Sequence, residues 1–260
     1  SLNKNNYMEW DMVLALIGVG FAAGFINTFA GSGSLLSLSM LMFLGLPANV
    51  ANGTNRIAIL LQNIVGVTSF HKQKVFDYKL GWKYGIYALL GSIAGAQIAV
   101  ELNNDVMEKV IGGLFIIMFI IILFRPDVWI KGKAGKVNQL PNFVQFIIFF
   151  FIGMYGGFIQ AGVGFFILAG LVLGAGLDLL HANPLKLFII LLYIPVTLVI
   201  FIIHGQVDIK LGLLLAIGNM SGAFVASRLA IRWGVKFMRI FLLVVLVFAI
   251  LHLFGIIRLV

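Results

Sequence analysis

Several classes of residue and motif are missing from this sequence. It contains no cysteine, which excludes disulfides, thiolate chemistry and cysteine-based metal sites. Only 10% of its residues are charged, whereas about a quarter is usual in a soluble domain. The phosphate-binding signature G-x-x-x-x-G-K-[S/T] is absent, as is a polar stretch long enough to hold an ATP-hydrolysing domain. Any work that the protein does therefore has to draw on an ion or substrate gradient.

Acidic residues are missing from the middle of every apolar segment. They lie near predicted segment ends or in loops, at Glu9, Asp11, Asp77, Glu101, Asp105, Glu108, Asp127, Asp178 and Asp208. Pathways for cations or protons across a membrane usually bury a carboxylate. The pattern disfavours a metal or organic-cation transporter, and it names no coupling ion.

Long apolar runs fill most of the chain, and 62% of the residues are hydrophobic. A helix needs roughly 17–25 apolar residues to span a bilayer, and most runs reach that length: 12–29, 80–100, 106–124, 143–160, 185–203, 211–226 and 237–257. Strand-like alternation over about ten residues is absent, which excludes a transmembrane barrel, and no cleavage-site pattern follows 12–29. We expect an all-α, multi-pass integral membrane protein whose net charge of +9 mainly marks cytoplasmic loops and indicates no nucleic-acid partner.

The chain repeats itself at a constant offset of 131 residues. Matches at glycine, asparagine and aspartate in one register carry this inference, because apolar matches alone are common. They pair Gly31 with Gly162, Gly33 with Gly164, Gly45 with Gly176, Asn52 with Asn183, Asp77 with Asp208 and Gly91 with Gly222. We predict a first transmembrane repeat over 8–124, a basic cytoplasmic linker over 125–141 and a second repeat over 142–260.

Each repeat is predicted to contain a hairpin followed by three spanning helices. The second arm of each hairpin (35–46; 165–177) is too short to cross a ~30 Å hydrocarbon core, so we expect a re-entrant or broken-helix hairpin with a glycine-rich tip. Irregular backbone is tolerated at membrane depth where it faces protein or a water-filled cavity. Two such tips entering from opposite faces would meet near the midplane.

Loop charges predict that the two repeats have inverted topology, as in many secondary transporters. Loops 70–80 and 125–141 are rich in lysine, which predicts that they lie on the cytoplasmic side. Loop 101–109 is mainly acidic, which predicts that it lies outside. In the second half, 204–210 reads outside and 228–239 reads inside. Equivalent loops then lie on opposite sides, and both termini lie outside.

Two cations accompany the glycine tips. Arg56 and Lys186 lie one residue apart in the repeat register, and the N-termini of broken helices add a partial positive charge. Together these features predict an anion site. The candidate substrate-binding residues are Asn27, Gly31, Ser32, Gly33, Ser34, Asn52, Gly53, Thr54, Asn55, Arg56, Gln160, Gly162, Gly164, Asn183 and Lys186; no metal site or cofactor is expected.

Plainer interpretations of the same residues stay open. The tip glycines could serve only close packing, as we expect for Gly91/Gly95 and Gly218/Gly222. Asn52, Thr54 and Asn183 could be helix N-caps, and Arg56 and Lys186 could snorkel to an interface. Gln62 and Asn63 could hydrogen-bond between helices.

The sequence resembles the TauE/SafE sulfite exporter family. The resemblance rests on the tracts at 24–34, 44–47 and 51–55 and on the second-half copy at 156–164, and it covers nearly the whole chain. It departs from the family pattern at Ser34, where a further glycine is usual, and at Phe165 and Phe166, which replace small residues. The family implies a transporter of sulfite, organosulfonates and related small acids, in the inner membrane of a bacterium.

We therefore expect a secondary transporter, not an enzyme, that moves a small sulfur-containing or organic anion by alternating access. An anion channel and a carrier of small carboxylates are the alternatives. An intramembrane serine hydrolase would need a base near Ser32 or Ser34, and no histidine or carboxylate lies mid-segment. The expected partners are a small anionic substrate and the lipid bilayer; the oligomeric state stays open.

Overall fold

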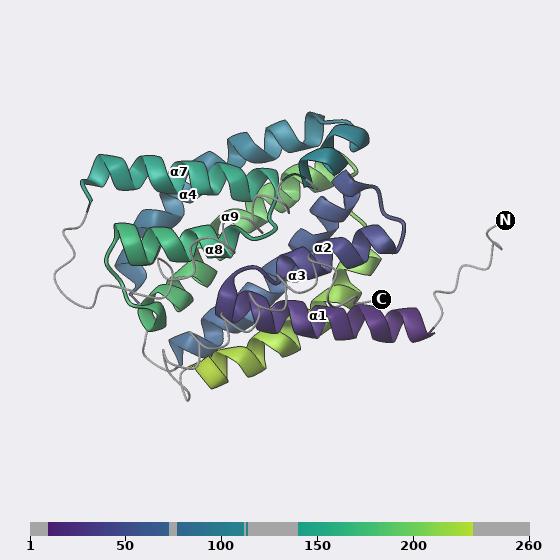
Figure 1. Cartoon of the computed structure of the whole chain (residues 1–260), viewed down its shortest axis with the longest axis horizontal. Helices are drawn as coiled ribbons and strands as arrows, with labels where there is room; N and C mark the ends of the chain where they lie inside the picture. The colour runs from purple at the N-terminus through teal and green to yellow at the C-terminus, as the bar shows by residue number, and fades with distance from the viewer. Residues whose placement is uncertain (1–9, 73–76, 112, 114–139, 231–260) are drawn as a thin grey trace.

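The protein is built from helices throughout the part that the structure describes. The computed structural model describes residues 10–72, 77–111, 113 and 140–230, and every regular element there is helical (Figure 1). This confirms the all-α expectation. Most of the predicted segment 106–124, most of the linker 125–141 and the whole segment 237–257 fall outside the described residues.

The first half forms a hairpin and two long helices. Helix α1 (Trp10–Ala30) is followed by the shorter α2 (Ser34–Phe43), and then by α3 (Ala48–His71) and α4 (Tyr78–Glu101). The turn between α1 and α2 contains Gly31 at φ +76°, a left-handed conformation that glycine adopts without a steric penalty. A helix also begins at residue 104.

The second half has the same order of elements. Helix α7 (Asn142–Phe158) precedes α8 (Val163–Ala169), which continues as the π-helical turn η1 (Gly170–Gly174); α9 (Leu179–Ile203) and the helix Ile209–Ala230 follow. The register is kept, since α3 and α9 begin 131 residues apart, at 48 and 179, and so do α4 and the last helix, at 78 and 209.

Matching aspartates start the fourth helix of each half. The Asp77 carboxylate accepts a hydrogen bond from the Leu80 N–H at 3.1 Å, and the Asp208 carboxylate accepts one from the Leu211 N–H at 2.9 Å. Each is the N-cap interaction that satisfies an otherwise unpaired backbone donor. The Asp77–Asp208 match in the sequence therefore reflects the same local structure.

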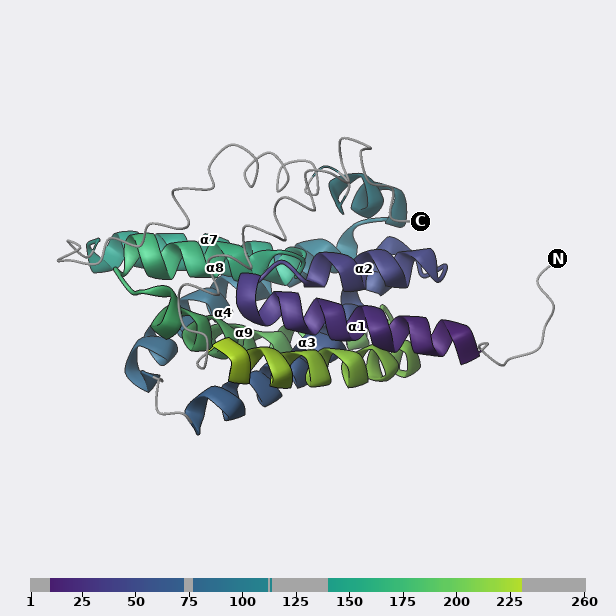
Figure 2. The ribbon, with the colours of Figure 1, turned by 60° about the horizontal axis from the view of Figure 1, so that its bottom comes forward.

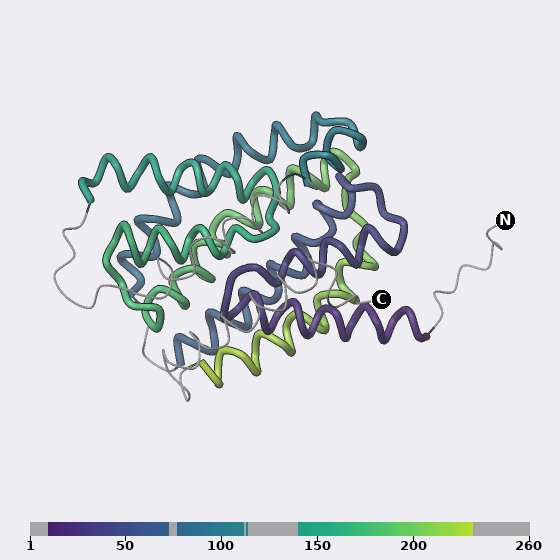
Figure 3. The backbone as a smooth tube through the Cα atoms, viewed as in Figure 1, coloured from purple at the N-terminus to yellow at the C-terminus, as the bar shows by residue number. Residues whose placement is uncertain are grey.

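Equivalent helices of the two halves run in opposite directions. In Figures 1 and 2, α1 runs from right to left and α7 runs from left to right. The tube in Figure 3 shows the same reversal for α3, which descends to the left, and α9, which rises to the right beside it.

Among the residues that the structure describes, three helices are long and apolar enough to cross a membrane: Trp10–Ala30, Leu179–Ile203 and Ile209–Ala230. Helix α4 has comparable length and exposes a stripe of large apolar side chains at Trp82, Ile86, Leu90 and Ile93. In water such a stripe would promote aggregation, whereas in a bilayer it faces lipid. By contrast, α3 buries a series of polar side chains, which lowers its hydropathy although its 24 residues suffice to span.

Glycines bring the halves into close contact at two helix pairs. A Cβ added at Gly91 or Gly95 of α4 would meet the backbone of α7 at Phe150 or Met154. Gly218 and Gly222 of the last helix face α1 in the same way, at the carbonyls of Ile17 and Phe21. The predicted close-packing role of these glycines is thus confirmed, and each pair joins one helix from each half.

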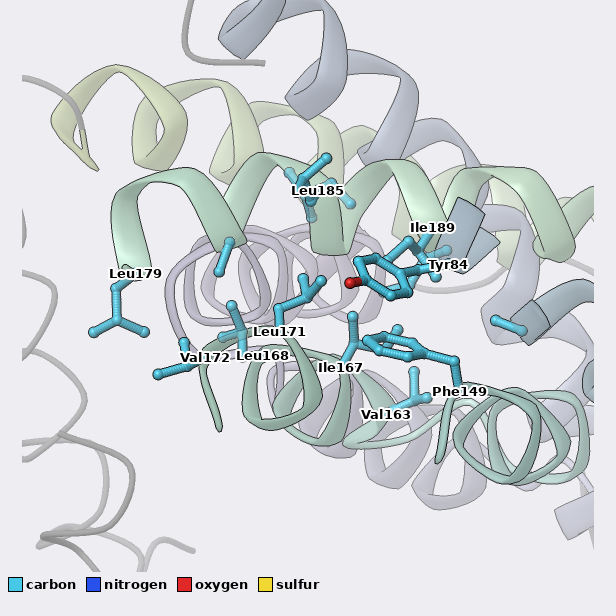
Figure 4. Close-up of a cluster of buried hydrophobic side chains, with 14 of the residues drawn as sticks. Tyr84, Phe149, Val163, Ile167, Leu168, Leu171, Val172, Leu179, Leu185 and Ile189 are labelled. Carbon is cyan, nitrogen blue, oxygen red and sulfur yellow. The ribbon is translucent and has the colours of Figure 1, made fainter. Parts of the chain in front are cut away.

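An apolar core lies where α4, α7, α8 and α9 pack together (Figure 4). The rings of Tyr84 and Phe149 stack with their centroids 4.4 Å apart. Ile167 and Leu171 of the α8–η1 arm and Ile189 of α9 complete the cluster. The short arm is therefore held by the protein interior along its length.

Candidate functional site

The two glycine-rich tips touch each other. Gly31 and Gly162 both have φ +76°, and a Cβ on Gly164 would lie 2.6 Å from the Cα of Gly31. The Gly162 N–H donates to the Ser34 hydroxyl across the contact at 3.1 Å. The backbones can approach this closely only because side chains are absent at these positions.

The first hairpin is closed upon itself, and the second is tied to α9. A Cβ at Gly33 would clash with the backbone of Ala23 and Asn27 in α1, so this glycine allows α2 to return along α1. Asn27 and Ser34 are buried, while Ser32 is partly exposed. In the second hairpin, Gln160 is buried and accepts a hydrogen bond from the Tyr193 hydroxyl of α9 at 3.0 Å.

Lys186 of α9 points its ammonium group at the end of α1. The side chain is fully buried, and Nζ donates to the carbonyls of Asn27 (2.9 Å) and Thr28 (2.8 Å) and to the side-chain oxygen of Asn183 (2.7 Å). An ammonium has three protons to donate, so all three are used in this conformation.

Arg56 of α3 holds the corresponding end of α7. Its guanidinium donates to the carbonyls of Gly156 (3.3 Å) and Gly157 (2.6 Å) and to the Thr197 hydroxyl (3.0 Å). The guanidinium carbon also lies 4.3 Å from the centroid of the Phe201 ring, a favourable cation–π position. Arg56 is fully buried, and its Nε makes no hydrogen bond.

The two cations thus make reciprocal contacts, because each half of the chain supplies the cation that caps the first helix of the other. Carbonyls at a helix C-terminus carry a partial negative charge, which stabilises a cation there. Within the described residues, neither Arg56 nor Lys186 forms an ion pair with a carboxylate. The carbonyls and neutral side chains accept hydrogen bonds from both groups but supply no full opposite charge. Snorkelling to an interface is ruled out by complete burial.

The asparagines that could have been N-caps lie inside their helices. The N-cap of α3 is Pro47 and that of α9 is Asp178, so the capping interpretation of Asn52, Thr54 and Asn183 is wrong. Instead the Asn52 amide donates to the Phe158 carbonyl at the end of α7 (2.8 Å). The Asn183 Oδ1 accepts from Lys186, while its Nδ2 is buried without a partner.

Three further predicted residues contact other segments. The Asn55 Oδ1 accepts from the Ser37 hydroxyl of α2 at 2.7 Å. Thr54 accepts from the Asp208 N–H at 2.8 Å, and a Cβ at Gly53 would meet the Gln206 carbonyl. Gly53 and Thr54 therefore dock the loop that follows α9, whereas Asn55 joins α3 to the first hairpin.

Sequence reasoning missed two residues that complete the surroundings of Arg56. Thr197 receives a guanidinium hydrogen bond, and Tyr193 binds Gln160. Tyr193 and Thr197 follow Lys186 by 7 and 11 residues, so all three lie on the same face of α9. Helical periodicity counted from Lys186 could therefore have predicted them. No group of three or more His, Cys, Asp or Glu residues suited to a metal occurs among the described residues.

Known protein sequences are similar to this one over almost the whole chain. The profile of the sulfite exporter TauE/SafE family matches residues 16–253. The chain belongs to this family. Its relatives are named as probable membrane transporter proteins. Together with the apolar helices, this makes the chain a multi-pass integral membrane protein of a transporter family.

Individual relatives are similar over most of their length. "Probable membrane transporter protein ORF9" of Sinorhizobium sp is 26% identical over 92% of this chain and 90% of its own. "Probable membrane transporter protein YfcA" of Escherichia coli K12 is 28% identical over 88% and 85%, and a "Probable membrane transporter protein" of Haemophilus influenzae is 24% identical over 88% and 89%. No solved structure matches the chain significantly.

Proposed function

We propose that this TauE/SafE protein is a secondary carrier of a small sulfur-containing or organic anion, of the sulfite and organosulfonate class. It would act in a bacterial inner membrane by alternating access, with the two halves inserted in opposite orientations. The observation that carries the proposal is the pair of fully buried cations, Arg56 and Lys186, joined to the touching glycine tips by neutral partners alone. The reversed directions of equivalent helices support the inverted topology.

Charge is the physical reason for choosing an anion. A buried cation is costly unless an opposite charge or a set of hydrogen bonds compensates it. Here the helix-end carbonyls provide the hydrogen bonds, while two positive charges remain in surroundings of low dielectric constant. A small anion is the ligand that these charges attract most strongly, and the buried Arg56 Nε is a donor still available to it.

Movement follows from the closed contact between the tips. Gly31 and Gly164 leave no space for a ligand between their backbones, so the tips must separate before an anion can reach the cations from either side. A rocking motion of one half against the other would open the contact alternately to the two faces of the membrane.

Counterflow in proteoliposomes tests this proposal. Vesicles holding the purified protein and loaded with unlabelled anion should accumulate labelled sulfite, thiosulfate, sulfoacetate or taurine in a saturable manner, and excess outside anion should inhibit uptake. A large conductance without counterflow would instead show a channel. Uptake of simple carboxylates but of no sulfur anion would support a carrier mechanism but would show that the substrate class is carboxylates.

A further inference from the structure

A second polar position lies deeper along α3, apart from the cations. Asn63 is fully buried, and neither its Oδ1 nor its Nδ2 has a hydrogen-bond partner. The next residue towards the N-terminus, Gln62, accepts a hydrogen bond from the Asn219 amide at 3.1 Å, whereas the Gln62 Nε2 and the Asn219 Oδ1 are buried and unpaired. Gln62 thus makes the predicted bond between helices, and Asn63 does not.

Packing gives no reason for a polar group at Asn63. The residues one turn before and after it on α3, Ile59 and Val67, both belong to the apolar cluster that includes Leu187 and Ile190 of α9. A leucine or isoleucine at position 63 would continue that cluster without leaving polar atoms unsatisfied. Buried carboxamides in native proteins are normally hydrogen-bonded, so both polar atoms of Asn63 are available to bind a ligand.

Helix geometry connects this position to Arg56. The two residues are seven apart, so they lie on the same face of α3, two turns or roughly 10 Å from each other. An anion that leaves Arg56 along this face of α3 would meet Asn63 next. The inference therefore rests on the proposed function and concerns the chemistry that the substrate must carry.

The mixture of free atoms restricts that chemistry. At Asn63 the amide N–H groups lack an acceptor and the amide oxygen lacks a donor. A plain oxyanion would pair with the N–H groups but would place its own oxygens against the amide oxygen. A bare cation would join two buried positive charges in a region where the described residues bury no carboxylate.

We propose that Asn63 forms a second binding position that selects an oxyanion carrying its own hydrogen-bond donor. The oxyanion accepts from the amide N–H groups, and a hydroxyl or ammonium group of the same molecule donates to an amide oxygen. Asn63 is suited to this role because a carboxamide offers a donor and an acceptor side by side.

A matched pair of sulfonates tests the proposal. Ethanesulfonate and 2-hydroxyethanesulfonate differ by one hydroxyl, and each is used to inhibit uptake of the labelled anion in proteoliposomes. The wild-type protein should prefer the hydroxylated compound by roughly tenfold, which corresponds to one net hydrogen bond in a buried site. In Asn63→Leu the ratio should fall to about one, with ethanesulfonate inhibiting at least as well as before.

A control separates this effect from the loss of any buried amide. Gln145 is also buried, but its oxygen and nitrogen are bonded to Tyr84, Lys83 and the Leu140 carbonyl, so Gln145→Leu should keep the tenfold preference. Equal inhibition by both sulfonates in the wild type, or an unchanged ratio in Asn63→Leu, overturns the inference and leaves the carrier intact. Uptake of the labelled anion that neither sulfonate inhibits also overturns the inference, whereas the absence of saturable uptake of any labelled anion overturns the proposed carrier itself.

The absence of cysteine allows an independent test of access. Asn63→Cys should react with an anionic methanethiosulfonate reagent, and 2-hydroxyethanesulfonate should slow the reaction. Ala58→Cys, buried in the other apolar cluster of the protein, should not react. An unreactive Asn63→Cys in a protein that still transports would mean that the substrate does not reach this position, against the proposal.

Discussion

At the scale of single residues, the two buried cations combine a structural and an electrostatic role. Arg56 and Lys186 hold the ends of α7 and α1, so removing either leaves helix-end carbonyls unpaired. The same side chains carry the positive charge that would attract an anion. A useful experiment must therefore measure stability and transport in the same variants.

We expect Arg56→Ala and Lys186→Ala each to lower anion uptake to background. Each should also reduce stability by about 1–3 kcal/mol for the unpaired buried carbonyls, measured as a shift in the melting temperature in detergent. Lys83→Ala removes a partly exposed cation that binds Asn142 and Gln145 and should leave uptake unchanged. Normal uptake in both alanine variants would remove the cations from the proposed site.

The tip contact can be separated from backbone strain by comparing two glycines. Gly31 and Gly45 both have positive φ, at +76° and +89°, so alanine costs about 1–2 kcal/mol of conformational energy at either position. Only at Gly31 would the new methyl group meet the opposite tip, because nothing lies within 4 Å of a Cβ at Gly45. We expect Gly31→Ala to block uptake and Gly45→Ala to retain it; equal uptake by the two folded variants would show that the tip contact plays no part in transport.

At the scale of helices, the sequence predicted lengths and order well because a bilayer imposes them. The short arms expected at 35–46 and 165–177 appear as α2 and as α8 with η1. What the pattern could not show was the partner of each polar group. Asn52 and Arg56 find their partners on α7, 100 or more residues away, and a three-dimensional contact between the halves leaves no trace in local periodicity.

Glycines within one helix provide a test of the packing between halves. A Cβ at Gly24 of α1 would collide with the backbone of Asn219, whereas nothing lies within 4 Å of one at Gly18. We expect Gly24→Ala to destabilise the protein by about 1–3 kcal/mol through overpacking. Gly18→Ala should stabilise α1 by about 0.4–1 kcal/mol, because alanine reduces the entropy of the unfolded chain. Melting in detergent measures both, and similar shifts of the same sign would contradict the packing of α1 on the last helix.

At the scale of the whole molecule, the repeat joins these features into one arrangement. The halves share a register of 131 residues, and their equivalent helices run in opposite directions. Each half also supplies a basic side chain that binds the first helix of the other half. Composition and register were readable in the sequence, because glycine and aspartate recur where backbone geometry requires them. The sequence did not predict that each half supplies a basic side chain to the first helix of the other half. Arg56 and Lys186 are one residue out of exact register, and they reach their helix ends from different helical faces.

Inverted insertion predicts that equivalent positions are accessible from opposite sides of the membrane. Lys79 and Lys210 are equivalent, at the starts of α4 and of the last helix, and both are exposed. Because the wild-type chain has no cysteine, Lys79→Cys and Lys210→Cys can each be the sole target of a membrane-impermeant thiol reagent in intact cells. The lysine-rich loop before α4 should be cytoplasmic, so Lys79→Cys should react only after the cells are opened, and Lys210→Cys should react in intact cells. Reaction of both from one side would mean that the antiparallel helices do not reflect opposite insertion, and a rocking carrier with two equivalent halves would then be untenable.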